Sequence, residues 1–275
     1  MDWLKTILYG FIAGLTELLP VSSQAHRMLA SLLLGVDGHV PLLRMLIRVA
    51  CFAALLVCCG GEIRKIRRET RLAKVPARRR TRPLDLKSVN TMRLLKVAGV
   101  PLVLGMLLYG KTDPMVQTLH LLALFLGING VLLFVPHLLK TGNKDSRMLS
   151  PFDGILIGLS GALGVIPGMS CMGAMLSTAS MRGVDKGYAL SFALLLQLPV
   201  MAVIFVFEAI ALRTGVEMIS LMVLLKYALT MAAAYLGCTT AVSVMRALAA
   251  KAGFSGFAYY CWGAALFTLI LYLTT

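Results

Sequence analysis

Charged residues are scarce in this chain of 275 residues. Asp, Glu, Lys and Arg together make up 14% of it, while hydrophobic residues make up 59%. Soluble globular domains carry about a quarter of their residues as charged side chains. The composition therefore excludes an ordinary soluble enzyme. It indicates a polytopic membrane protein, in which roughly six or seven apolar segments of about 20 residues each span the bilayer.

The sequence also shows neither the cysteine spacing of a metal site nor the pattern of a cleavable leader. The six cysteines lie in or beside apolar segments without the spacing of a zinc site, so we expect them to pack as small hydrophobic side chains. The first apolar segment carries Asp2, Lys5 and Glu17 and leads into no small-residue cleavage motif. We therefore expect this segment to be retained.

Aromatic residues are absent from the most basic stretch. The net charge is +15, and eleven Lys and Arg residues lie between positions 64 and 87. Without aromatic side chains to stack on bases, this stretch does not favour nucleic-acid binding. The positive-inside rule predicts a cytoplasmic loop over residues 61–90, next to anionic lipid head groups.

Polar residues do occur inside the first apolar stretch, residues 15–28. They would cost several kcal/mol if they faced lipid, so we expect them to face a cavity. Pro20 ends one helix, and Ser22 or Ser23 is a good N-cap for the next. Free N–H groups and the positive dipole end of that second half-helix would bind an anion, phosphate above all. The polar side chains of this stretch are Glu17, Ser22, Ser23 and His26.

Apolar runs predict an all-α fold with two broken, re-entrant hairpins and six transmembrane helices. The first hairpin covers residues 3–35 and precedes spans at about 40–60, 91–110 and 115–139. The second covers residues 151–182, is broken at Pro167-Gly168, and precedes spans at about 187–211, 218–246 and 255–275. The basic loop joins the first two spans.

The two halves, residues 1–147 and 148–275, share a pattern. The spacing Gly10-x-x-x-Gly14 matches Gly154-x-x-x-Gly158, and each pair precedes a proline break with serine beyond it. Chance similarity between apolar sequences is the alternative. An odd number of spans per half would turn the second half over, giving an inverted repeat whose two breaks meet near the midplane. Glycines four residues apart would let helices approach closely. The same topology places all four basic segments in the cytoplasm; they are residues 61–90, residues 140–150, Arg182 with Lys186, and Arg246 with Lys251.

Several side chains near the two breaks are candidate site residues. Glu17 is a candidate acid or metal ligand, Ser23 a hydroxyl donor and His26 a nucleophile or proton donor. The alternative is that the serines only cap helices and that Glu17 and His26 satisfy one another. For Arg44 and Arg48, which lie four residues apart, the alternative is snorkelling to the outer head groups, which suits Arg44 better than the deeper Arg48. The expected phosphate-binding residues are Ser22, Gly168, Ser170, Arg48 and Arg27.

These motifs resemble the undecaprenyl pyrophosphate phosphatases of bacterial envelopes, the bacitracin-resistance family. The matching pieces are Gly14-Leu15-Thr16-Glu17-Leu18-Leu19-Pro20-Val21-Ser22-Ser23 with His26, Pro167-Gly168-Met169-Ser170, and Leu190-Ser191-Phe192 with Pro199. The resemblance implies the inverted-repeat fold in the bacterial plasma membrane. It also implies hydrolysis, on the outer face, of a C55 lipid pyrophosphate to the monophosphate, so that the carrier is reused for wall synthesis. A divalent cation (Mg or Ca) and a polyprenyl (pyro)phosphate lipid are the implied cofactor and partner, and a homodimer is one possible assembly.

The resemblance also assigns roles, and the chain departs from the family at some of them. Glu17 would be the second acid of a Glu-x-x-x-Glu motif and a metal ligand, Ser23 a phosphate contact, and His26 the nucleophile or general acid. Ser170 would be the first serine of Pro-Gly-x-Ser-Arg-Ser. The departures are Ala13 for the first acid, Cys171 for the arginine, Met172 for the next serine and Ser160 for a glutamine.

Losing the arginine removes a bidentate phosphate clamp. We expect Arg48 or Arg27 to supply the missing cation. Three functions stay open: a lipid pyrophosphate phosphatase with a rearranged site, a polyprenyl phosphate flippase or binder that has lost catalysis, and an unrelated small-anion transporter.

Overall fold

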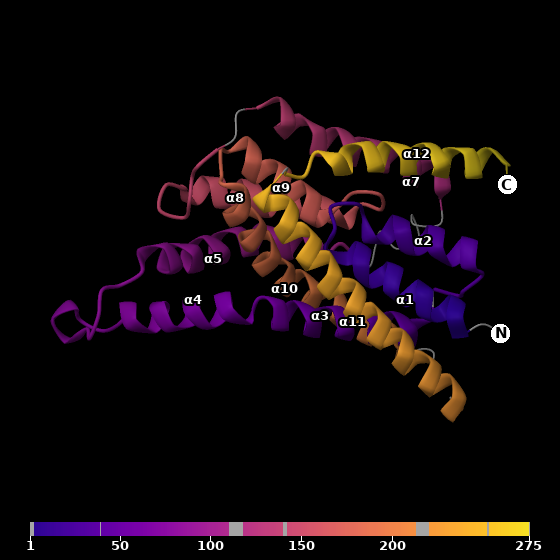
Figure 1. The fold of residues 1–275 in the computed structure, drawn as a ribbon, viewed down its shortest axis with the longest axis horizontal. Coiled ribbons are helices and arrows are strands. Elements are labelled where there is room, and N and C mark those ends of the chain that lie inside the picture. Colours follow the sequence, from indigo (N-terminus) through magenta and orange to yellow (C-terminus); the bar gives the residue numbers. More distant parts are fainter. Residues whose placement is uncertain are drawn as a thin grey trace.

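Six long apolar helices form the body of the protein (Figure 1). The computed structural model describes residues 3–38, 40–109, 118–139, 142–212, 220–251 and 253–274, and these contain no β-strand. The predicted all-α membrane fold with six spans is confirmed. The predicted starts of the third and fifth spans, at 115 and 218, lie outside the described residues. The six helices are α3 (Pro41–Cys58), α5 (Leu86–Met106), α7 (Leu119–Phe134), α10 (Lys186–Leu212), α11 (Leu221–Ala250) and α12 (Gly256–Thr274).

Two pairs of shorter helices form the predicted broken hairpins. The first pair is α1 (Trp3–Leu18) and α2 (Ser23–Leu34); the second is α8 (Pro151–Ala162) and α9 (Cys171–Met181), with a 3-10 turn at Leu163–Val165 between them. Ser22 caps α2 and Ser170 caps α9, as the sequence predicts, and both pairs end at a glycine with positive φ. Each break therefore starts a new helix with free N–H groups.

The basic segment corrects one prediction. Residues 61–90 are not a continuous loop, because helix α4 (Gly60–Ala73) covers the first part and α5 begins at Leu86. The stretch before Pro76 is rich in Arg, Lys and Glu, which are strong helix formers. Glu69 is buried beneath the segment and accepts hydrogen bonds from both terminal nitrogens of Arg82. A hydrogen bond from Lys65 also lowers the pKa of Asp85 to about 2, so the Asp85 carboxylate is ionised at neutral pH and pairs with Lys65 (2.9 Å).

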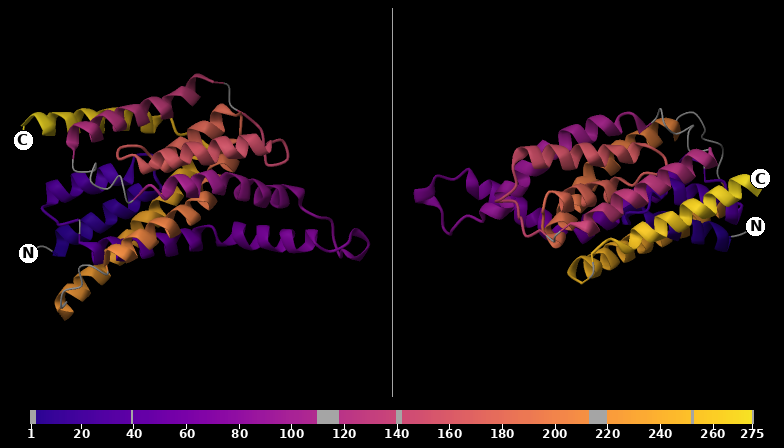
Figure 2. Two further views of the ribbon diagram at one scale, coloured as in Figure 1. Left: turned by 180° about the vertical axis from the view of Figure 1, so that it is seen from behind. Right: turned by 90° about the horizontal axis from the view of Figure 1, so that it is seen from above.

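The helices of the two halves pack on one another in a matched way (Figures 1 and 2). Helix α1 packs on α11, α8 packs on α5, α3 contacts α10 and α11, α5 contacts α10, and α7 lies along α12. Exchanging α1, α3, α5 and α7 with α8, α10, α11 and α12 leaves this set of pairs unchanged. The pattern supports the predicted repeat, whose inverted orientation in the membrane stays a prediction.

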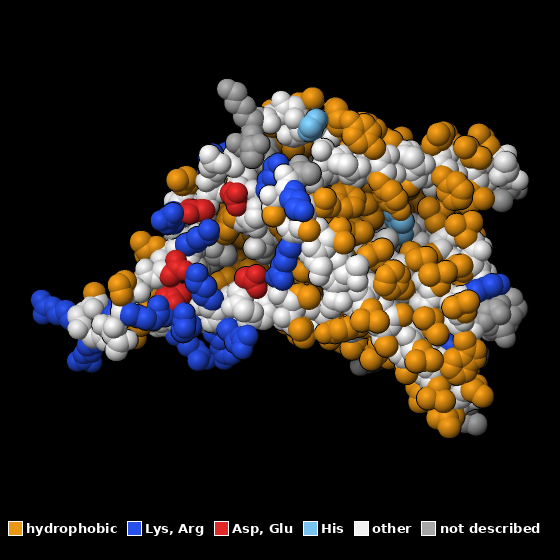
Figure 3. All heavy atoms as spheres, in the orientation of Figure 1, with side chains coloured by type: hydrophobic (Ala, Val, Ile, Leu, Met, Phe, Trp, Pro, Cys, Tyr) orange, Lys and Arg blue, Asp and Glu red, His pale blue; other side chains and the backbone are white. Residues whose placement is uncertain are grey.

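The predicted basic segments meet at one end of the molecule, which we call the basic end. Arg246 at the end of α11 donates to the carbonyl of Cys58 (2.9 Å), where α3 meets α4. Ser146 donates to the carbonyl of Lys87 (2.7 Å), at the start of α5. The backbone of Lys144 pairs with the turn between α9 and α10. Figure 3 shows the cations gathered there, while the start of α1 and the end of α12 lie at the other end (Figure 1).

Close helix contacts make Gly14 a position where any side chain should be costly. A Cβ atom there would lie 2.0 Å from the carbonyl oxygen of Ala234 on α11. We expect Gly14→Val to force α1 off α11 and to lower the free energy of unfolding by about 3 kcal/mol. The melting temperature of the detergent-solubilised protein measures this. Gly99→Val on α5 is the matched control, since a Cβ there meets nothing within 4 Å; equal melting temperatures for the two variants would contradict the prediction.

Candidate functional site

The two helix breaks face one another across a single pocket, as the sequence predicts. The pocket receives side chains from α1, α2, α3 and α10 and from the segment that starts α9. Its polar lining consists of Thr16, Glu17, Ser23, Gln24, Arg27, Arg48, Tyr109, Ser170 and Gln197, with Cys171 beside them. Segments far apart in the sequence therefore supply one site.

Asn129, on α7, joins the two breaks. Its Nδ2 donates to the carbonyl oxygen of Pro20 (3.1 Å), and its Oδ1 accepts from the backbone N–H of Ser170 (3.0 Å). The side chain is completely buried. Pro20 and Ser170 thus have their backbone groups satisfied by one amide. A lone amide within an apolar span is the one signal that could have pointed to this residue, and the prediction missed it.

Arg48 lies inside the pocket and pairs with Glu17. Its Nη1 donates to the Glu17 carboxylate, while its Nε and Nη2 have no hydrogen-bond partner in the part of the chain that the structure describes. Arg48 is 2% exposed, so it does not snorkel to head groups. Buried donors without partners are costly, and a phosphate oxygen would satisfy them. The prediction that Arg48 belongs to the site is supported by this placement.

Two helix N-termini point at the same pocket. The N–H groups of Ser23 and Gln24 at the start of α2, and of Cys171 and Met172 at the start of α9, have no acceptor among the described residues. Helix N-termini favour anions through free N–H groups and the positive end of the dipole. Arg27 adds a second cation and forms no ion pair with a described carboxylate. The pocket therefore carries more positive than negative charge.

The backbone of Ser170 does not join this cradle. We expected its N–H to bind phosphate, but Asn129 already accepts from it. The Ser170 hydroxyl accepts from the backbone of Gly173 (3.1 Å) and still lines the pocket. Ser170 is thus a helix cap whose oxygen reaches the site.

Three predicted site residues lie outside the pocket lining. The His26 ring stacks on the ring of Tyr260 on α12 instead of lining the pocket. Its Nδ1 contacts the carbonyl of Ser22 (2.9 Å) and its Nε2 the hydroxyl of Tyr260 (2.8 Å). The alternative, in which His26 and Glu17 satisfy one another, is not seen, because Glu17 pairs with Arg48.

Ser22 and Gly168 have backbone roles instead of phosphate contacts. The Ser22 side chain accepts from Ala25 and caps α2, with φ at 64°. Gly168 has φ at 95°, and a Cβ there would lie 2.9 Å from the carbonyl of Leu122 on α7. Both residues shape the breaks that present the pocket. As phosphate ligands they find no support in this geometry.

The carboxylates present do not fit a metal held by the protein. Among the described residues, Glu17 is the one acid lining the pocket, and Arg48 occupies its Oε1. Within the described residues, no group of three His, Cys, Asp or Glu side chains lies close enough to hold a metal ion. A divalent cation prefers several oxygen ligands. The expected divalent cation is left with a single, already paired carboxylate.

Gln197 lies next to Cys171, the position at which the family pattern has arginine. The Cys171 thiol donates to Gln197 Oε1 (3.2 Å), and both side chains line the pocket. The free cavity is about 30 Å³, the volume of roughly one water molecule in the liquid. A diphosphate therefore enters only if side chains such as Arg48 turn aside from their present partners.

Comparisons with known proteins place this pocket in context. A family model described as "Bacitracin resistance protein BacA" matches residues 6–267. A protein of Methanobrevibacter smithii named "Undecaprenyl-diphosphatase" is 27% identical over 267 residues, or 95% of each chain. Proteins of the same name from Alkaliphilus metalliredigens and a Nocardioides species are 27% identical over 269 residues and 32% identical over 209 residues. These alignments cover 95% and 76% of this chain, and 96% and 75% of the respective relatives.

Proposed function

The chain belongs to the bacitracin resistance protein BacA family, and from this premise we propose that it hydrolyses undecaprenyl diphosphate to the lipid monophosphate and inorganic phosphate. One observation carries the proposal: the two helix breaks converge on a buried pocket that holds Arg27, Arg48, Glu17 and Ser23. Cations, free N–H groups and a carboxylate are the groups that phosphoryl transfer requires.

The proposed setting is the plasma membrane of a bacterial cell, with the basic end in the cytoplasm and the pocket open to the outer side. The positive-inside rule supports this orientation. The matched packing of the two halves, 1–147 and 148–275, supports an inverted repeat. The polyprenyl chain would lie along the apolar helix surfaces while the diphosphate enters the pocket. A homodimer stays a prediction.

In the proposed reaction, water attacks the terminal phosphorus and the bond from that phosphorus to the bridging oxygen breaks. The unpaired Nε and Nη2 of Arg48 bind phosphate oxygens first. Its Nη1 then leaves Glu17 and also binds a phosphate oxygen. Arg27, the N-termini of α2 and α9 and the Ser23 hydroxyl stabilise the charge on the transferring group. Glu17, released from its ion pair, accepts the proton of the attacking water. The lipid monophosphate leaves, and inorganic phosphate remains.

His26 is then a positioning residue, because its ring holds the carbonyl of Ser22 and the hydroxyl of Tyr260. We expect Tyr260→Phe to lower kcat by about tenfold with little change in KM, since it frees the ring that fixes the start of α2. His26→Gln should lower kcat at least as far. If His26 instead attacked phosphorus directly, His26→Gln would abolish turnover while Tyr260→Phe kept it within about threefold of wild type.

Phosphate release from undecaprenyl diphosphate tests the proposed function. We expect turnover by the detergent-purified protein, and a loss of about 100-fold or more in Glu17→Ala. Arg147→Gln, an exposed arginine at the basic end, is the control that should keep wild-type turnover. Absence of turnover together with retained lipid phosphate binding would reject the enzyme and direct the next assay to lipid flipping in vesicles.

Cation dependence is a separate prediction. Because Arg48 already neutralises Glu17 and no second carboxylate of the described part of the chain lines the pocket, we expect EDTA to lower phosphate release by less than about tenfold. The rate in EDTA, followed by addition of Mg²⁺ or Ca²⁺, measures this. A complete loss in EDTA that Mg²⁺ restores would show that a cation binds here with ligands from the substrate.

A further inference from the structure

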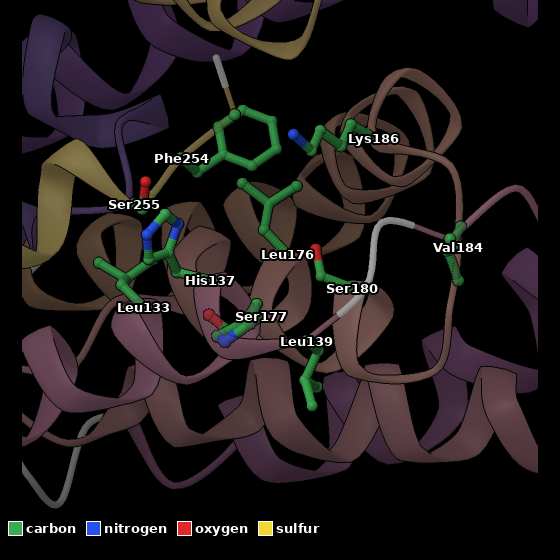
Figure 4. Close-up of a pocket in the computed structure, with 13 residues that line it drawn as sticks. Leu133, His137, Leu139, Leu176, Ser177, Ser180, Val184, Lys186, Phe254 and Ser255 are labelled. Atoms are coloured by element: carbon green, nitrogen blue, oxygen red, sulfur yellow. The ribbon is translucent and has the colours of Figure 1, made fainter.

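A second polar pocket lies at the basic end, away from the candidate site. It is formed where the end of α7, the last turns of α9, the start of α10 and the connection from α11 to α12 come together. Figure 4 shows His137 and Ser255 on one side and Lys186 and Ser180 on the other, with Leu176 between them. The cavity is about 100 Å³, which accommodates about three water molecules or one phosphoryl group.

The polar lining consists of hydrogen-bond donors with one cation. Lys186 is half-buried and forms no ion pair with a described carboxylate, and its side chain lies against Gly253. His137 and the hydroxyls of Ser180 and Ser255 complete the set, and none of the described carboxylates lines the pocket. The nearby Asp185 caps α10 by accepting from the backbone of Tyr188 (2.9 Å). This chemistry fits an oxyanion better than a cation.

Ser177 gives an independent sign that a ligand belongs here. It is 2% exposed, lines the pocket, and its hydroxyl has no hydrogen-bond partner within the described ranges. Serine within a helix commonly donates to the carbonyl four residues earlier, but Ser177 does not. A buried hydroxyl without a partner costs about 1–3 kcal/mol. An oxygen atom of a bound anion would remove that cost.

We propose that this pocket is a second binding site for a phosphate-type oxyanion, either inorganic phosphate or the head group of a lipid monophosphate. Lys186 supplies the charge, Ser177 and Ser180 donate from α9, and His137 closes the other side. The apolar walls formed by Leu176 and Phe254 would suit the first carbons of a lipid chain. Helix α9 links the two sites, because Ser170 caps it in the first and Ser177 lies in its later turns.

Titration of the purified full-length protein tests the proposal, with inorganic phosphate in one arm and undecaprenyl phosphate in the other. Arg48→Gln, used below its measured melting temperature, serves as the background, because it weakens the first site and Arg48 lies outside the lining of the second. We expect binding to persist in that background and to weaken by about tenfold or more on adding Lys186→Gln or Ser177→Ala. Lys144→Gln, an exposed cation at the same end outside the lining, is the matched control.

The two arms identify the ligand. Binding of both compounds, or of inorganic phosphate alone, assigns the pocket to phosphate itself, and binding of the lipid alone assigns it to a head group. The proposal is overturned if neither binds in the Arg48→Gln background, or if Lys186→Gln and Ser177→Ala bind like the Lys144→Gln control. Because turnover is not the readout, failure here is distinct from failure of the proposed phosphatase.

Discussion

Replacing Arg48 with glutamine is expected to lower kcat for phosphate release by about 1,000-fold, the scale on which arginines act in phosphoryl transfer. Two guanidinium nitrogens of Arg48 lie inside the pocket without a partner among the described residues, and in the proposed mechanism Arg48 stands in for the cation that Cys171 does not supply. Glutamine keeps a hydrogen-bond donor but loses the charge. Arg48→Lys, which keeps the charge without the planar fork, should fall between the two.

Folding must be separated from catalysis in this experiment, because Arg48→Gln also leaves Glu17 buried without its partner. Breaking a buried ion pair costs about 3–5 kcal/mol. Arg44→Gln is the matched control: Arg44 lies one turn earlier in α3 and pairs with the buried Glu208 (2.9 Å), outside the pocket lining. We expect both variants to lose similar stability, with turnover per folded molecule preserved only in Arg44→Gln. Equal turnover in both would remove Arg48 from the mechanism.

Replacing Asn129 with leucine is expected to lower the free energy of unfolding by about 2–5 kcal/mol and to separate the two breaks. Leucine has a similar volume but would leave the Pro20 carbonyl and the Ser170 N–H buried without partners, each at a cost of about 1–3 kcal/mol. The melting temperature and phosphate release of the same preparation report the two effects. We expect turnover to fall together with stability, because the cradle depends on the distance between the breaks.

A neighbouring substitution controls for the bulk of leucine in α7. Gly127→Leu lies two residues earlier, where a Cβ meets nothing within 4 Å, so it should leave stability and turnover near wild type. Asn129→Asp keeps the acceptor for Ser170 and loses the donor to Pro20, and should be intermediate. If Asn129→Leu were as stable and active as Gly127→Leu, the amide bridge would have no energetic importance.

The spans, the breaks and the caps follow from the sequence alone. An apolar run of about 20 residues must satisfy its own backbone in lipid, so it forms a helix wherever it occurs. Pro20 and Pro167 each end a helix, and the serines after them cap the next one. Both hairpins could therefore be predicted from the sequence. The basic helix α4 was not predicted, because the positive-inside rule gives the side of the membrane on which the charges lie and not their secondary structure.

The contents of the pocket were decided by tertiary structure. Glu17 and Arg48 are 31 positions apart, and Asn129 and Pro20 are 109 apart. Nothing in the local sequence says which polar side chains will meet, and a buried polar group accepts whichever partner the packing brings within about 3 Å. His26 is a second example. The local sequence places it just beyond the break, but only the packing of α12 brings Tyr260 to its ring. The sequence by itself thus determined where polar groups enter the membrane, and helix packing alone determined which of them share a site.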